Sequence, residues 1–136
     1  MRVFYRLVKR NPSTLQDVLS QAALRQPCPR PHDPEFVQKW EGLSVFANEA
    51  DVRALGSARK WKPGVYIATL HIPDDAPLTY QEPEHEGSSH WLVYDRNGCM
   101  LDESTAGIVL WYVVRIVHGV TNQEWTPRGR QFRVIE

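Results

Sequence analysis

The sequence has few cysteines, few lysines and no net charge. Its two cysteines, Cys28 and Cys99, are too few for a disulfide framework, and Met1 leads directly into a strand-like stretch, so we expect a reduced, cytoplasmic protein. Lys and Arg total 16 and balance 16 Asp and Glu. Because no overall field then attracts nucleic acid or an anionic membrane, we expect neither as a partner. The longest apolar run, residues 108–114, is far shorter than the roughly 20 residues that span a bilayer.

The sequence also lacks the short motifs of several common chemistries. It has no Gly-rich phosphate loop, no Cys-x-x-Cys pair, no His-Glu-x-x-His and no Gly-x-Ser-x-Gly. Acidic residues and a histidine gather in residues 73–88 without the spacing of a metal site, so we expect no metal and interpret this stretch as a charged loop. Cys28 lies between prolines, away from any helix N-terminus, so we expect no catalytic thiol there. A basic cluster at residues 128–133 is interpreted as a solvated face.

The residues that are present predict one α+β domain spanning residues 1–136. The length and the 42% hydrophobic content are typical of one globular domain. β-Branched and aromatic runs predict a twisted, mainly antiparallel sheet, and apolar periodicity predicts two main helices. The predicted strands cover residues 2–8, 43–46, 65–72, 90–95, 108–117 and 131–135, and the predicted helices cover residues 15–25 and 49–62.

Capping residues support the two predicted helices. Ser13 followed by Gln16 is a capping-box pattern for the first, and Asn48 is a favourable N-cap for the second, which a Pro-Gly pair ends. Between them, residues 26–35 contain four prolines and indicate a stiff loop, followed by a helical turn at residues 36–40.

An Asn97-Gly98 pair between apolar residues predicts a β-hairpin. In that register His90 lies diagonal to Glu103 on the facing strand. A histidine beside a carboxylate is able to act as an acid or base, and the alternative is a structural surface pair. Residues 108–117 would follow as a central strand.

Arg6 is the most informative charge in the predicted sheet. Strand alternation places it on the same face as Phe4 and Val8. Two interpretations stay open at this point. The guanidinium either snorkels or pairs with a carboxylate in a structural role, or it binds an anion at a ligand cleft.

Several short motifs carry a resemblance that covers roughly residues 3–72. They are Tyr5-Arg6, Trp40-x-Gly42-x-Ser44-Val45, Ala58 and Gly64-x-Tyr66-Ile67-Ala68-x-Leu70. The set resembles small uncharacterised bacterial proteins, and the order of elements resembles a minimal ADP-ribosyltransferase-type fold.

This resemblance implies a cleft that binds NAD. Arg6 would hold phosphate, Ser44 would bind ribose and Tyr66 would line the pocket. His90 or Glu103 would do the polar or acid–base work. The Glu-x-Glu or Gln-x-Glu of a late strand is absent here, and Glu103 and Glu124 are the candidates for its catalytic carboxylate. The reaction would be attack on the nicotinamide ribose carbon, with a carboxylate stabilising the developing positive charge.

The sequence therefore leaves two functions open. One is a nucleotide-binding, ADP-ribosyltransferase-like enzyme of a bacterial toxin or defence system, with NAD as cofactor. The other is a non-catalytic module that binds another protein, for which the five tryptophans provide aromatic surface.

Overall fold

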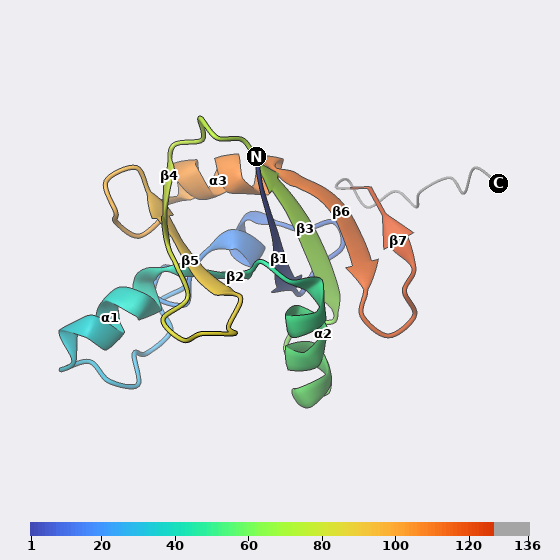
Figure 1. Cartoon of the computed structure of the whole chain (residues 1–136), viewed down its shortest axis with the longest axis horizontal. Coiled ribbons are helices and arrows are strands. Elements are labelled where there is room, and N and C mark those ends of the chain that lie inside the picture. The colour runs from blue at the N-terminus through green and yellow to red at the C-terminus, as the bar shows by residue number, and fades with distance from the viewer. Residues whose placement is uncertain (127–136) are drawn as a thin grey trace.

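The computed structural model describes residues 1–126 and shows a seven-stranded antiparallel sheet with helices on both faces (Figure 1). The strand order across the sheet is β4-β5-β2-β1-β3-β6-β7. The strands are β1 (Arg2–Val8), β2 (Leu43–Phe46), β3 (Tyr66–Ile72), β4 (Leu78–Gln81), β5 (His90–Asp95), β6 (Val113–His118) and β7 (Glu124–Trp125). The helices are α1 (Pro34–Glu41), α2 (Glu49–Ala58) and α3 (Glu103–Trp111), with a 3-10 helix η1 at Leu15–Val18. The predicted α+β class and antiparallel sheet are confirmed.

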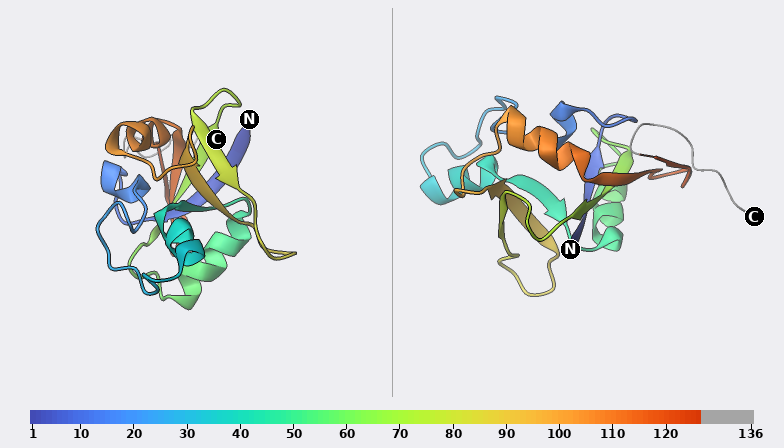
Figure 2. Two further views of the ribbon diagram at one scale, coloured as in Figure 1. Left: turned by 90° about the vertical axis from the view of Figure 1, so that its left-hand side faces the viewer. Right: turned by 90° about the horizontal axis from the view of Figure 1, so that it is seen from above.

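The first face of the sheet carries the main apolar core. On β1, Phe4 and Val8 point to this face and are buried against α3 and η1, which lie on the same side of the sheet (Figure 2). α3 is apolar around much of its circumference, as a helix buried against a core must be. Core residues on this face include Phe4, Val8, Val18, Leu43, Val45, Leu70, Ile72, Val93, Ala106, Val109, Val113 and Ile116.

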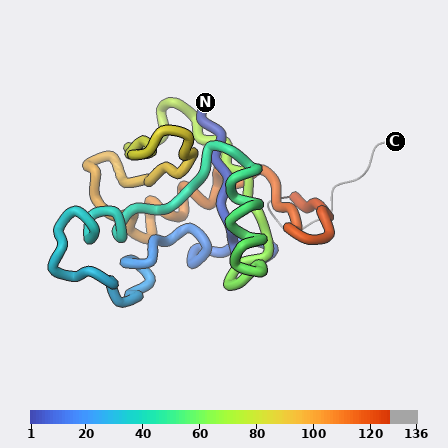
Figure 3. The backbone as a smooth tube through the Cα atoms, turned by 60° about the horizontal axis from the view of Figure 1, so that its bottom comes forward, coloured from blue at the N-terminus to red at the C-terminus, as the bar shows by residue number. Residues whose placement is uncertain are grey.

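The second face is covered by α1 and α2, with β2 running between them (Figure 3). α2 is capped by the side chain of Asn48, which accepts the N–H of Ala50 at 2.8 Å, so this predicted cap is confirmed. Val52 of α2 is fully buried over this face. α1 has no buried residue and is attached through the Tyr94 hydroxyl, which donates to the Gln38 carbonyl at 2.7 Å. Because the two helices cover the face only in part, a polar hollow stays open over β2 and β5.

The predicted helix over residues 15–25 is wrong. Only the four residues of η1 are helical, and the capping box is formed by Thr14 and Asp17 instead of Ser13 and Gln16. The Asp17 carboxylate accepts the backbone N–H of Thr14 at 2.8 Å and that of Lys9 at 2.9 Å. These bonds fold the segment back against the end of β1, so it turns where an extended helix was expected.

The predicted proline loop holds the start of α1. Pro34 occupies the first turn of the helix, where its missing N–H is not needed. Asp33 caps the helix by accepting the N–H of Phe36 at 3.2 Å. Residues 26–33 form the predicted loop, but α1 begins at Pro34, inside the stretch predicted as a loop. The helical turn predicted at residues 36–40 lies within α1.

The predicted hairpin after β5 is wrong as well. Asp95 accepts the N–H groups of Asn97 and Cys99, both at 2.8 Å, and closes a turn. Asp102 then caps α3 by accepting the N–H of Thr105 at 2.8 Å. The first half of the predicted strand at residues 108–117 is thus helical, because a buried helix and a buried strand both appear as continuous apolar runs.

The structure also bears on the predicted acidic loop and on the C-terminal residues. β4 lies inside the stretch predicted as an acidic loop, and pairs with β5 at the edge of the sheet. The basic cluster at residues 128–133 and the predicted strand at residues 131–135 lie outside the described residues. Within residues 1–126, no helix has both the length and the apolar character needed to cross a membrane.

Candidate functional site

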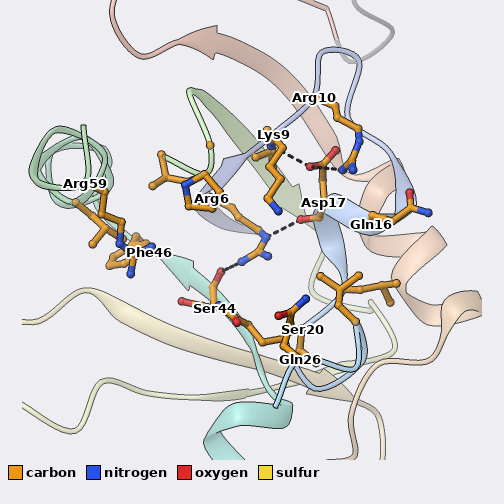
Figure 4. A pocket seen from close by; sticks show the side chains of 18 of the residues that line it. Arg6, Lys9, Arg10, Gln16, Asp17, Ser20, Gln26, Ser44, Phe46 and Arg59 are labelled. Atoms are coloured by element: carbon orange, nitrogen blue, oxygen red, sulfur yellow. Dashed lines mark hydrogen bonds and ion pairs between the residues drawn. The ribbon is translucent and has the colours of Figure 1, made fainter. Parts of the chain in front are cut away.

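The candidate site begins where β1 and β2 diverge. β1 pairs with β3 along its whole length, but it pairs with β2 only at Tyr5 and Phe46. The guanidinium of Arg6 lies in the opening (Figure 4). Its Nε donates to the Asp17 carbonyl at 2.7 Å and its Nη1 donates to the Ser44 carbonyl at 2.6 Å. Arg6 therefore connects β1, η1 and β2 where strand-to-strand bonds stop.

Arg6 keeps its charge and has donors left to use. Burial lowers the pKa of Arg6 to about 10, and the negative charge of Asp17 opposes that shift. The guanidinium is therefore charged at neutral pH. A guanidinium has five N–H donors, and two of them make the bonds to the Asp17 and Ser44 carbonyls. The others are free for a ligand, since no other residue in 1–126 accepts a hydrogen bond from this side chain.

A cavity of about 520 Å³ lies at this opening and is bordered by residues from both faces of the sheet. This volume is within the usual range for small-molecule sites. The cations that line it are Arg6, Lys9, Arg10 and Arg59.

Asp17 is the one carboxylate among the described lining residues. Its side chain is 1% exposed and ion-paired with Arg10 at 3.3 Å, in addition to the two backbone N–H groups that it accepts. The cations that line the cavity therefore outnumber its carboxylate, and the cavity has an excess of positive charge.

A second hollow, of about 360 Å³, lies on the second face between α1 and residues 82–88. Its floor holds Ser44 and His90, whose Oγ and Nε2 atoms are 2.5 Å apart. The β2–β5 register pairs Ser44 with Leu92 and Phe46 with His90, so Ser44 and His90 are diagonal neighbours on one face. Other lining residues are Phe36, Lys39, Trp40, Gln81, Glu82, Glu84, His85, Ser88 and Leu92. We call this hollow the Ser44–His90 groove.

The imidazole of His90 is suited to act as a base. His90 stays partly exposed, and the partial burial of its ring lowers the pKa of His90, so the ring is neutral at neutral pH. In the tautomer with an unprotonated Nε2, the Ser44 hydroxyl donates to His90 and the ring is placed to take its proton. The backbone N–H of His90 donates to Ser88 Oγ at 3.2 Å and its ring packs on Phe46 at 5.1 Å, so the imidazole is held in position.

The cavity and the Ser44–His90 groove adjoin one another and share part of their lining. Both are lined by Gln21, Gly42 and Ser44. A Cβ atom at Gly42 would lie only 2.8 Å from the Tyr94 ring, so a side chain there would displace the residue that anchors α1. The two hollows thus form one bipartite site, cationic at one end and partly aromatic at the other, with Ser44 at the junction.

Three of the five predicted site residues come together here. Arg6, Ser44 and His90 line the bipartite site. Tyr66 does not line it, and packs instead edge-on against His118 at 5.4 Å. Glu103 begins α3 and lines neither hollow, so its predicted place diagonal to His90 is wrong.

Sequence reasoning missed several residues of the site. Lys9, Arg10 and Arg59 line the cavity, and Glu82 lines the groove. The pair Lys9-Arg10 at the end of a strand that already carries Arg6 was an available signal. Arg59 follows the end of α2, and nothing local in the sequence shows that this end faces the opening between β1 and β2.

No protein-family model matches the chain, and neither does any curated protein or solved structure. The resemblance to an ADP-ribosyltransferase-type fold therefore stays a prediction. Within residues 1–126, no three His, Cys, Asp or Glu side chains are grouped to hold a metal ion.

Proposed function

We propose that the protein binds a nucleotide, with its phosphate groups in the cation-lined cavity. The observation that carries this proposal is the charged guanidinium of Arg6, fixed at the opening between β1 and β2 with unused N–H donors. Guanidinium groups match phosphate oxygens in geometry and charge. Lys9 and Arg59 add charge around the same space, and a partly desolvated site weakens the competition from water and salt.

The Ser44–His90 groove supports a ligand with an aromatic ring. Phe36 and Trp40 stack in it with ring centroids 6.2 Å apart and an interplanar angle of 23°. Such aromatic faces favour stacking of a nucleobase or nicotinamide ring. NAD combines a pyrophosphate with two planar rings, so it is the first ligand to test, and it is also the ligand that the sequence resemblance implies.

Transfer of ADP-ribose would require a free carboxylate near the bound ribose. Asp17 is unsuited because its oxygens already accept hydrogen bonds. Glu82 lines the groove with His90, is exposed, and has no hydrogen-bond partner among residues 1–126. Glu82 therefore replaces Glu103 as the candidate carboxylate for this chemistry.

A second function, binding of another protein, is favoured by one apolar surface. Trp111 at the end of α3 is 78% exposed, and Ile108 one turn earlier is 38% exposed. A large exposed tryptophan is a frequent anchor of protein interfaces. This surface is separate from the bipartite site, since neither residue lines it.

Isothermal titration calorimetry with NAD, AMP and inorganic phosphate tests the proposed nucleotide site. We expect NAD to bind more tightly than phosphate, and Arg59→Ala to weaken the binding of both by about tenfold, which corresponds to roughly 1.4 kcal/mol. Arg59 suits the test because it is exposed and its side chain makes no bond that the fold needs.

The matched control is Arg96→Ala, which removes an exposed arginine outside both hollows and should leave the affinity unchanged. Absence of heat with all three ligands at millimolar concentration would refute the proposed function and leave protein binding as the favoured one.

A further inference from the structure

We infer that Ser44 is a nucleophile with His90 as its base, and that the site cleaves a P–O bond of the bound ligand. The substrate class is a phosphodiester or phosphoanhydride of a nucleotide. This inference rests on the proposed function, because it is the phosphate held in the cation-lined cavity that Ser44 attacks.

The geometry of Ser44 and His90 is that of a nucleophile and its base. The two side chains are 2.5 Å apart, within the reach required for proton transfer. Both come from paired strands, β2 and β5, which form four consecutive residue pairs, so their separation is set by a rigid part of the sheet. The ring of His90 also packs against the ring of Phe46.

The position of the pair indicates chemistry over a structural role. β2 and β5 are already joined by their backbone ladder, so the sheet does not need this side-chain bond. His90 is exposed, and the pair lies on the floor of a groove that a small molecule enters from solvent.

The charge around Ser44 selects phosphorus as the electrophile. Arg6 Nη1 donates to the carbonyl of Ser44 itself at 2.6 Å, so the guanidinium lies beside the residue that would attack. The cavity with Lys9 and Arg59 adjoins the groove, and Ser44 lines both of them. An anionic phosphate is attracted into this space, and the added charge of the transition state is stabilised there. A neutral carboxylic ester carries no charge that would attract it into this space before the reaction.

The reaction balances without an oxidant or a metal. Ser44 Oγ attacks phosphorus, its proton passes to His90 Nε2, and the P–O bond to the leaving group breaks. The protonated His90 then gives that proton to the leaving oxygen. Water next attacks the phosphoseryl group, its proton goes to His90, and the Ser44 oxygen leaves and recovers the proton. A phosphodiester gives a phosphate monoester and an alcohol or phenol, whereas a phosphoanhydride such as that of NAD gives two phosphate monoesters, one of which is AMP.

The test compares turnover and binding in the same variants. Bis-p-nitrophenyl phosphate and NAD are the substrates, and p-nitrophenol and AMP are the measured products. We expect the wild-type protein to turn over, Ser44→Ala to lose activity at least 100-fold, and His90→Gln to lose about 100-fold or more. Ser104→Ala removes an exposed hydroxyl on α3 outside both hollows and should keep full activity.

A second measurement tests whether Ser44 is the nucleophile by covalent labelling. A fluorophosphonate probe should attach to the Ser44 peptide of the wild-type protein, as found by mass spectrometry, and its rate of attachment should fall in His90→Gln. Labelling of Ser44 at an equal rate in both proteins would overturn the role of His90 as base.

The outcomes separate this inference from the proposed function. Calorimetric binding of NAD with no turnover by the wild-type protein overturns the inference and leaves nucleotide binding intact. Absence of binding refutes the proposed function. Turnover that survives Ser44→Ala overturns the inference, and Ser44-dependent hydrolysis of p-nitrophenyl acetate without hydrolysis of the phosphodiester overturns phosphorus as the electrophile.

Discussion

The two faces of the sheet are built from the same strands and are covered in opposite ways. On the first face, Phe4 and Val8 of β1 lie in a continuous apolar core under α3 and η1. On the second face, α1 contributes no buried residue, and a polar groove with Ser44 and His90 stays open. Apolar burial dominates folding free energy, whereas a ligand needs accessible polar groups. The first face should therefore set the stability of the protein and the second its chemistry.

Removal of a core ring should produce the largest effect and act on stability alone. Phe4 is 2% exposed and packs against Tyr80 and Trp91, with ring centroids 5.8 and 5.6 Å away. We expect Phe4→Ala to lower the free energy of unfolding by about 3–5 kcal/mol, measured by urea titration. Val3→Ala, next to it on the second face, is the control and should change stability by less than about 1 kcal/mol.

The protein that stays folded in Phe4→Ala should bind NAD with wild-type affinity. If affinity fell in step with stability under conditions where the variant is folded, the two faces would be coupled and their division of roles would be wrong.

Asp17→Asn should move stability and affinity in opposite directions. The carboxylate accepts backbone N–H groups from Lys9 and Thr14 and pairs with Arg10. Hydrogen bonds to a charged group contribute about 1.5–3 kcal/mol each, so we expect a loss of about 2 kcal/mol in unfolding free energy. The change also removes the one carboxylate among the described residues of the cavity, so phosphate should bind more tightly.

Urea titration and calorimetry on the same protein measure both effects of Asp17→Asn. Asp75→Asn, an exposed loop residue, is the control for the loss of one negative charge. Weaker phosphate binding in Asp17→Asn, with the fold intact, would show that this carboxylate organises the cavity more than it repels the ligand.

The two faces also differ in how far the sequence predicts them. Apolar alternation and β-branched composition predicted the four strands β1, β2, β3 and β5, and the Asn48 cap predicted the start of α2. α3 was missed because its second half is apolar on the exposed side, at Ile108 and Trp111, as well as on the buried side, so the sequence shows no polar stripe. The helical turn predicted at residues 36–40 lies within α1, but the start of α1 was missed because its proline-rich approach was interpreted without Asp33 as a cap.

The candidate site was predictable only residue by residue. Arg6, Ser44 and His90 were identified by residue type and position, but their meeting depends on the divergence of β1 from β2, which is a tertiary property. The contribution of Arg59 depends on the same divergence. Glu103 was misplaced because one turn closed by Asp95 and a cap at Asp102 turned an expected strand into a helix.

The pH dependence of stability should reveal the state of His90. Burial lowers the pKa of His90 in the folded protein below its ordinary value of 6.5, so the unfolded chain binds the proton more readily. Its contribution to stability is therefore full above pH 6.5 and is lost as the pH falls through the lowered pKa. Other charged or titratable groups that line the groove or lie at its end are Lys39, Asp51, Glu82, Glu84 and His85.

Urea titrations of the wild-type protein and of His90→Gln between pH 4.5 and 7.5 measure this contribution. The difference between the two curves should be constant above pH 6.5 and should change below it. The pH–rate profile of kcat/KM should rise through an apparent pKa below 6.5 if His90 is the base. Curves that stay parallel over the whole range would assign the proton uptake to another group.

The smallest effect is expected at the rim of the open face, where Lys39 of α1 pairs with Glu84 at 2.7 Å and Glu35 at 3.6 Å. Ion pairs at an exposed surface contribute little to folding, so Lys39→Met should leave the urea midpoint unchanged. The pair nevertheless connects α1 to residues 82–88 across the groove, so amide hydrogen exchange in those residues should become faster. Lys62 is an exposed lysine outside the groove, so Lys62→Met should alter neither the urea midpoint nor the rate of amide exchange. A loss of stability comparable to that of Asp17→Asn would mean that the rim helps to hold the second face together, and that the open face is not free to vary independently of the core.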